Sequence, residues 1–166
     1  MEVRPGRYTA GIEGDFVVFL IGMRFNHPLR VRKWLPVATA MPRMLKVLSS
    51  HPELGCLGFQ QWFGRTTILV QYWRDFDSLD RFARDKDLPH LEPWRQFNRA
   101  VRDSGEVGIW HETFRVRAGE YEAVYGNMPV FGLAAAGTHL PAARKGNTAA
   151  ARIGASTTDD PAVAPY

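Results

Sequence analysis

The sequence has a single cysteine, Cys56, among its 166 residues. This excludes an internal disulfide framework and any metal site built from several cysteines, and it is typical of a reducing compartment. Long apolar runs are also missing, since the longest, Phe16 to Met23, falls far short of the roughly 20 residues of a membrane-spanning helix. The first fifteen residues are polar and do not form a secretory signal. We therefore expect a soluble, cytoplasmic protein with no membrane partner.

An extended field of one charge sign is missing too, although the formal net charge is +4 and the isoelectric point is near 9.5. Basic residues alternate with acidic ones over 80–87, and the nearest approach to a basic patch runs from Arg30 to Lys33. Mixed charge and the lack of a reading motif argue against nucleic acid as a partner. The sequence has no His-x-x-x-His pair and no glycine-rich phosphate loop. We expect neither a nucleic-acid partner nor a metal site.

Apolar and aromatic residues are abundant, at 45% and 12% of the chain, which suffices for the core of one domain. Alternating apolar residues predict strands, and stripes that recur every three to four residues predict helices. Pro36 and Pro42 each lack an amide hydrogen, so we expect a short leading helix or a kink before the main one. The predicted strands are 15–26, 56–63, 67–73 and 107–116. A first helix is predicted over 29–49, a second begins at a cap formed by Asp75 or Asp77-Ser78, and a further helical piece covers 94–103.

The order of these elements, β-α-β-β-α-β, is that of the ferredoxin-like α+β fold, with a four-stranded antiparallel sheet and helices on one face. The first strand is apolar on both faces, so a second copy is expected to cover the open face and form a dimeric α+β barrel. Residues 15–133 are assigned to this domain. Residues 1–14 are predicted to be an extended N-terminal arm. Residues 134–166 are rich in Ala, Gly and Pro and are predicted to be a flexible tail, because they can bury little apolar surface.

Several segments, among them "VVFLIGMRFN", "LVQYWRDFDSLDRFAR" and "GEVGIWHETFRV", resemble a family of small bacterial and fungal proteins described as monooxygenase-like, domain of unknown function 4188. The resemblance covers roughly residues 7–140 and implies membership of the dimeric α+β-barrel superfamily. That superfamily includes cofactor-independent quinone-forming monooxygenases, polyketide cyclases, haem-degrading monooxygenases, chlorite dismutases and aldoxime dehydratases. The fold therefore does not select the chemistry.

The last predicted strand contains an adjacent pair, His111 and Glu112. Alternation along a strand directs neighbouring side chains to opposite faces, so the two do not form an acid–base dyad unless a bulge redirects one of them. His111 is a candidate general base because imidazole titrates close to neutral pH, and it is also a candidate haem ligand. The structural alternative is a half-buried histidine bonded to its neighbours. Glu112 is interpreted as a solvent or interface charge.

Other polar and aromatic residues complete the candidate site. His90 lies in a loop between two prolines, which can present a polar group to a pocket. Tyr72 is a third candidate catalytic residue, as a donor to a developing oxyanion. The predicted substrate-binding residues are Arg24, Asn26, Trp73, Trp110, Phe114 and Tyr125.

Together with the resemblance, these residues predict a monooxygenase-like enzyme without a bound cofactor. Its substrate would be apolar or aromatic, of the secondary-metabolite type, and would be activated by a base. Three alternatives stay open: a haem enzyme of the aldoxime-dehydratase kind with His111 as ligand, a cyclase or lyase, and a non-enzymatic ligand-binding homodimer.

Overall fold

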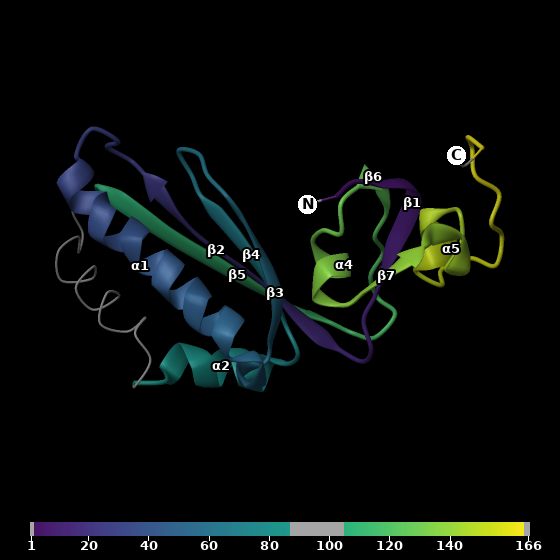
Figure 1. The fold of residues 1–166 in the computed structure, drawn as a ribbon, viewed down its shortest axis with the longest axis horizontal. Coiled ribbons are helices and arrows are strands. Elements are labelled where there is room, and N and C mark those ends of the chain that lie inside the picture. Colours follow the sequence, from purple (N-terminus) through teal and green to yellow (C-terminus); the bar gives the residue numbers. More distant parts are fainter. Residues whose placement is uncertain (1, 87–104, 165–166) are drawn as a thin grey trace. The chain divides into compact units, whose positions relative to one another are not determined.

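The β-branched and aromatic segments form a four-stranded sheet in a computed structural model, which describes residues 2–86 and 105–164 (Figure 1). Its strands lie in the order β3-β4-β2-β5, so that β2 is central and β3 and β5 are at the edges. This arrangement confirms the predicted ferredoxin-like α+β fold. The piece expected over 94–103 and His90 lie outside the described residues. The strands are β2 (Phe16–Phe25), β3 (Cys56–Trp62), β4 (Ile68–Trp73) and β5 (Val107–Val116).

Two helices, α1 (Val31–Ser50) and α2 (Phe76–Arg84), pack on one face of this sheet. Trp34 of α1 packs against a buried cluster that includes Met23 of β2 and Val107 of β5. On α2, the ring of Phe82 lies 5.3 Å from that of Trp73. The prediction of helices on one face is therefore confirmed for the described part of the chain.

Helix α1 is continuous through both of its prolines, which corrects the prediction of a separate leading helix. Pro36 and Pro42 remove the bonds to the carbonyls four residues earlier. Leu45 and Leu48 are buried on the stripe that faces the sheet, so tertiary packing stabilises the helix despite the lost bonds. Neither helix, nor any other in the described residues, is long and apolar enough to cross a membrane.

Helix α2 begins where the sequence predicts a cap. The side chain of Asp75 accepts a hydrogen bond of 2.6 Å from the amide of Ser78, which satisfies a donor of the first turn. Hydrogen bonds from Ser78 hold the pKa of the Asp75 carboxyl below its usual value. The negative charge also lies at the end of the helix where the backbone dipole is positive.

The chain folds as two compact units, one of residues 18–114 and one that joins residues 1–17 with 115–166. We call them the helix-covered unit and the terminal unit. In the terminal unit, strand β1 (Arg4–Gly11) pairs on one edge with β6 (Tyr125–Met128) and on the other with β7 (Thr138–Pro141). Three short helical segments complete it: α4 (Leu133–Ala136), a 3₁₀ turn (Ala142–Arg144) and α5 (Ala149–Arg152).

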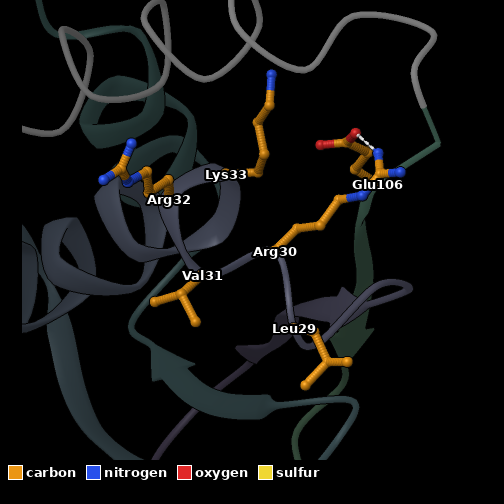
Figure 2. Close-up of a pocket in the computed structure, with 6 residues that line it drawn as sticks. All are labelled: Leu29, Arg30, Val31, Arg32, Lys33 and Glu106. Atoms are coloured by element: carbon orange, nitrogen blue, oxygen red, sulfur yellow. Dashed lines mark hydrogen bonds and ion pairs between the residues drawn. The ribbon is translucent and has the colours of Figure 1, made fainter.

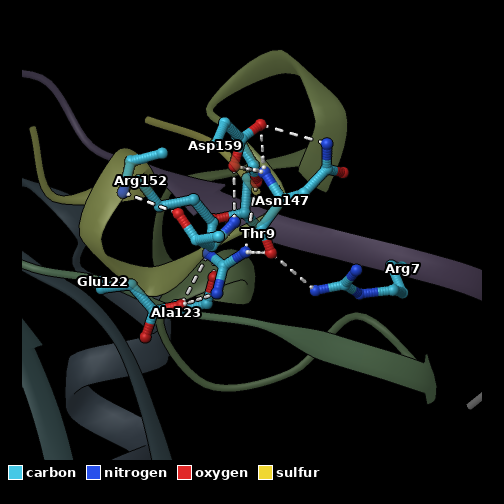
Figure 3. A network of polar contacts seen from close by, with 10 residues as sticks. Arg7, Thr9, Glu122, Ala123, Asn147, Arg152 and Asp159 are labelled. Carbon is cyan, nitrogen blue, oxygen red and sulfur yellow. Dashed lines mark hydrogen bonds and ion pairs between the residues drawn. The ribbon is translucent and has the colours of Figure 1, made fainter. Parts of the chain in front are cut away.

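The terminal unit corrects the predicted arm and tail. The expected arm, 1–14, contains the central strand of a sheet, and part of the expected tail, 134–166, forms one of its edges. Within the expected tail, Ala134 and Ala142 are buried, and polar contacts hold the segment around Asn147 and Asp159 (Figure 3). The carboxylate of Asp159 accepts from the amides of Asn147 and Thr148, each at 2.7 Å.

Candidate functional site

Strand β5 divides its side chains between the two faces of the sheet. Val107 and Ile109 belong to the cluster that packs against α1, so alternation directs His111 to the same, helix-covered side. His111 itself is exposed, because it lies beyond that cluster along the strand. Its ring lies 5.8 Å from the ring of Phe19, inclined at 44°. An accessible imidazole thus stands beside an aromatic surface.

The opposite face of the sheet is free of α1 and α2, and we call it the open face. Trp110 crosses β2 there at Gly22, where a Cβ would stand 2.6 Å from the indole Nε1. This Nε1 is buried and has no hydrogen-bond partner among the described residues. Alternation places on this face the side chains of Val18, Leu20, Trp62, Ile68, Val70, Tyr72, Trp110, Glu112 and Phe114.

The structure therefore brings together some of the predicted site residues and separates others. Tyr72, Trp110 and Phe114 share the open face, whereas His111 lies on the other side of the sheet. His111 and Glu112 point in opposite directions, as predicted from alternation. His111 cannot be the base for a substrate that Trp110 contacts on the same sheet of the same chain.

Arg24 and Asn26 lie where β2 ends, and protein groups already engage both. The Arg24 guanidinium donates to the hydroxyl of Thr66 at 2.7 Å, and the Asn26 amide donates to the carbonyl of Gly105 at 2.8 Å. These bonds join the end of β2 to the loops beside it. Either side chain would exchange a protein partner for a ligand on binding one.

Two predicted substrate-binding residues lie elsewhere. Trp73 has no exposed surface, and its indole donates to Gln71 at 2.8 Å, so it belongs to the core beneath α2 and does not fit a binding role. Tyr125 belongs to β6 of the terminal unit, where its hydroxyl accepts from the amide of Ala134 at 3.3 Å. Burial raises the pKa of the Tyr125 phenol.

A shallow cavity of about 550 Å³ opens at the start of α1. Figure 2 shows Arg30 directed toward Glu106, with which it forms an ion pair, while Lys33 extends away from that pair. The Arg30–Lys33 stretch was the nearest approach to a basic patch in the sequence, but only the fold shows that it lines a cavity. The lining residues are Leu29, Arg30, Val31, Arg32, Lys33 and Glu106.

No group of three or more His, Cys, Asp or Glu residues that could hold a metal ion occurs in the described part of the chain. A haem iron needs one protein ligand, and the exposed imidazole of His111 suits that role chemically. Ligation of a haem iron and general-base catalysis thus both require an accessible ring nitrogen of His111.

Two crystal structures of aldoxime dehydratase, one in complex with butyraldoxime, are similar to this chain in fold. Both superpose with a TM-score of 0.59 at 17% identity and cover 78% of this chain, which spans 42% and 40% of theirs. At that identity, the likeness shows the fold alone.

Monooxygenase af470 from Aspergillus fumigatus is a curated relative, 35% identical over 149 residues. The match covers 76% of this chain and 52% of the relative, so the chain spans about half the length of that protein. The profile of the Monooxygenase af470-like family matches residues 16–133, which include the whole four-stranded sheet. The chain belongs to the Monooxygenase af470-like family.

Proposed function

We propose that the protein is a monooxygenase-like enzyme that acts on an apolar or aromatic substrate of the secondary-metabolite type, with His111 as its general base. The observation that carries the proposal is the exposed His111 ring, 5.8 Å from Phe19 on the helix-covered side of the sheet. A flat apolar substrate would lie against the aromatic ring while the imidazole takes its proton. Family membership supports oxygenation as the reaction class.

The chemistry needs few protein groups. His111 removes a proton from a methylene that is activated by a neighbouring phenol or enol, and the carbanion reacts with O₂. One oxygen atom stays on the carbon as a carbonyl, and the other leaves as water with the two hydrogens of the methylene. The methylene carbon supplies all four electrons that reduce O₂, so the step balances without a bound organic cofactor.

The open face then serves assembly. Trp62 and Phe114 are exposed there among the apolar side chains of the sheet. A second copy that covers this face would remove them from water, as in a homodimeric barrel. In this proposal Trp110 and Tyr72 belong to the interface between subunits, and the substrate lies on the side of His111.

Oxygen uptake and mass spectrometry under ¹⁸O₂ test the proposal with a panel of phenols and enolisable polycyclic ketones. We expect one ¹⁸O atom in the product and a rate that falls about 10²–10⁴-fold in His111→Ala, which is the usual contribution of a general base. His51→Ala is the matched control, because His51 is an exposed histidine of the same unit, bonded to Glu53 at 2.7 Å. The control should keep the wild-type rate.

Other outcomes select the alternatives. Turnover that persists without O₂ and gives an unlabelled product identifies a cyclase or lyase. A Soret band after incubation with haemin that is lost in His111→Ala identifies the haem enzyme. Equal rates for wild type and His111→Ala would exclude this residue as the base.

A further inference from the structure

Two loops at one end of the helix-covered unit expose large apolar side chains. Leu29, in the loop before α1, is 96% exposed, and Phe63, in the β3–β4 turn, is 81% exposed. The Arg65 guanidinium of that turn donates to the carbonyls of Phe25 and Asn26 at 3.4 Å, which holds the two loops together. Figure 1 shows the start of α1 and the β3–β4 turn at the same end of the sheet. Both apolar side chains therefore lie at one end of the unit.

Within the described part of the chain, the two loops themselves carry basic residues and no acidic residue. The sequence contains no acidic residue between Asp15 and Glu53, and none between Glu53 and Asp75. Glu106 is the acidic residue that lines the cavity, and it is ion-paired with Arg30. The basic residues of the two loops and the adjoining element ends are Arg24, Arg30, Arg32, Lys33 and Arg65.

Exposed apolar tips and cations together are not explained by the fold. Leu29 and Phe63 bury almost none of their side chains in the core, and they are exposed at the same end of the unit. At a lipid interface the two features act jointly, since apolar side chains enter the acyl boundary while cations attract anionic headgroups. The cavity beside Arg32 and Lys33 is large enough to take a phosphate headgroup.

We propose that this end of the helix-covered unit, formed by residues 24–33 and 63–66, is a peripheral docking surface for an anionic phospholipid bilayer, in place of the absence of a membrane partner expected from the sequence. The surface lies against the membrane through Leu29 and Phe63 and is held there by the surrounding cations. It does not span the bilayer, and no helix in the described part of the chain is long and apolar enough to do so. The proposal is independent of the chemistry at His111, because it concerns binding alone.

Co-sedimentation of the full chain with vesicles tests the surface. We expect binding to phosphatidylcholine vesicles in which about a third of the lipid is phosphatidylserine, because this gives a negative surface potential. We expect little binding to vesicles of phosphatidylcholine alone. Arg32→Ala/Lys33→Ala should weaken binding about tenfold or more, because each cation near the surface contributes to attraction. Leu29→Ser/Phe63→Ser should weaken it by a similar factor, because the apolar anchors are lost. High salt should release the wild type.

Two control variants remove a cation and an apolar side chain that lie outside the proposed surface. Arg84→Ala takes away an exposed cation on α2, and Val163→Ser takes away an apolar side chain that is 81% exposed in the terminal unit. Both should bind vesicles like the wild type. Circular dichroism checks that each variant is folded, which is expected because the substituted side chains are exposed.

Two results would overturn the proposal. One is an absence of binding to the anionic vesicles, or binding that neither double variant weakens. The other is binding to a DNA duplex that depends on Arg32 and Lys33 while vesicle binding is indifferent to Leu29 and Phe63, which would identify a nucleic-acid surface.

Discussion

His139 shows how a residue in an unpromising segment acquires a defined environment. It lies in the Ala- and Gly-rich end of the chain, where a histidine is expected to be solvated. In the structure its ring stacks on Tyr8 at 4.2 Å and lies 6.4 Å from the ring of Tyr125. Its Nε2 is buried and has no hydrogen-bond partner among the described residues. Burial, reinforced by the positive charge of Arg4, lowers the pKa of this imidazole below 6.5.

A lowered pKa makes stability sensitive to acid in a defined direction. The unfolded imidazole, with a pKa near 6.5, takes up its proton before the folded one does, so stability is full above that pH and declines as the pH falls through it toward the folded pKa. We expect the free energy of unfolding to fall between about pH 7.5 and pH 5.5, a window that spans the unperturbed histidine value. His139→Phe, which keeps a ring in the stack, should show a smaller fall.

Urea unfolding of both proteins at the two pH values measures the effect. His51→Gln, which removes an exposed histidine, is the control and should retain the full wild-type fall. An identical pH dependence in His139→Phe would show that this imidazole is not responsible.

At the scale of elements, the inner strand β2 has close neighbours on both sides at Gly22. A Cβ there would stand 2.0 Å from the Thr67 carbonyl oxygen of the neighbouring chain segment and 2.6 Å from the indole of Trp110 on β5. A side chain at this point must push apart β5 and the start of β4. The glycine is therefore required by the spacing of the elements, not by a turn.

Gly22→Val should consequently destabilise the protein by about 2 kcal/mol or more, in the range of overpacked cores. Urea unfolding provides the measurement, and a change in tryptophan fluorescence should report the displaced indole of Trp110. Gly64→Val in the β3–β4 turn is the control, since a Cβ there meets its nearest neighbour at 3.5 Å, an ordinary contact. Equal stabilities of the two variants would contradict the argument.

Elements with strong periodicity could be predicted from the sequence, and elements shaped by local irregularity could not. The strands over 15–26 and 107–116 follow from runs of β-branched and aromatic residues. Strand β1 was not predicted because a glycine beside Pro5 is typical of a loop. In the structure this glycine, Gly6, has φ +100° and lies where the register between β1 and β6 shifts. The separate leading helix expected at Pro36 does not form for the opposite reason, since packing of the whole helix outweighs a local rule.

The candidate site was predictable only as far as alternation reaches. The separation of His111 from Glu112 follows from the strand alone, but which face the helices cover depends on packing between distant elements. The abundance of aromatic residues led to the prediction that Trp73 binds substrate, whereas in the structure Trp73 lies in the core. The exposed loops around Leu29 and Phe63 come together only through long-range bonds of Arg65. No local pattern contains such information.

At the scale of the whole molecule, the terminal unit depends on a buried arginine. The side chain of Arg152 is 5% exposed and donates to Glu122 at 2.6 Å and to the carbonyls of Gly146 and Asn147 at 3.1 and 2.9 Å (Figure 3). Arg7 of β1 donates to the same Asn147 carbonyl at 3.1 Å. These bonds connect the last segment of the chain to the sheet.

Arg152→Met should release that segment, because Glu122 and the Gly146 carbonyl lose the Arg152 guanidinium and the Asn147 carbonyl keeps only that of Arg7. We expect amide hydrogen exchange at Asn147 and Thr148 to accelerate at least about tenfold, which corresponds to about 1.4 kcal/mol of lost local stability. Arg144→Met, which removes an exposed arginine nearby, should leave exchange unchanged. Unaltered protection in Arg152→Met would mean that Asp159 alone holds the turn.

The position of β1 between β6 and β7 has a consequence for biosynthesis. The middle strand of this sheet is made first, and its partners on both sides are made more than a hundred residues later. The nascent β1 must therefore wait on the ribosome with both edges unpaired while the helix-covered unit, complete at residue 114, can already fold. A translation product that stops before residue 125 would keep these unpaired edges permanently, and β1 would then be its principal site of self-association.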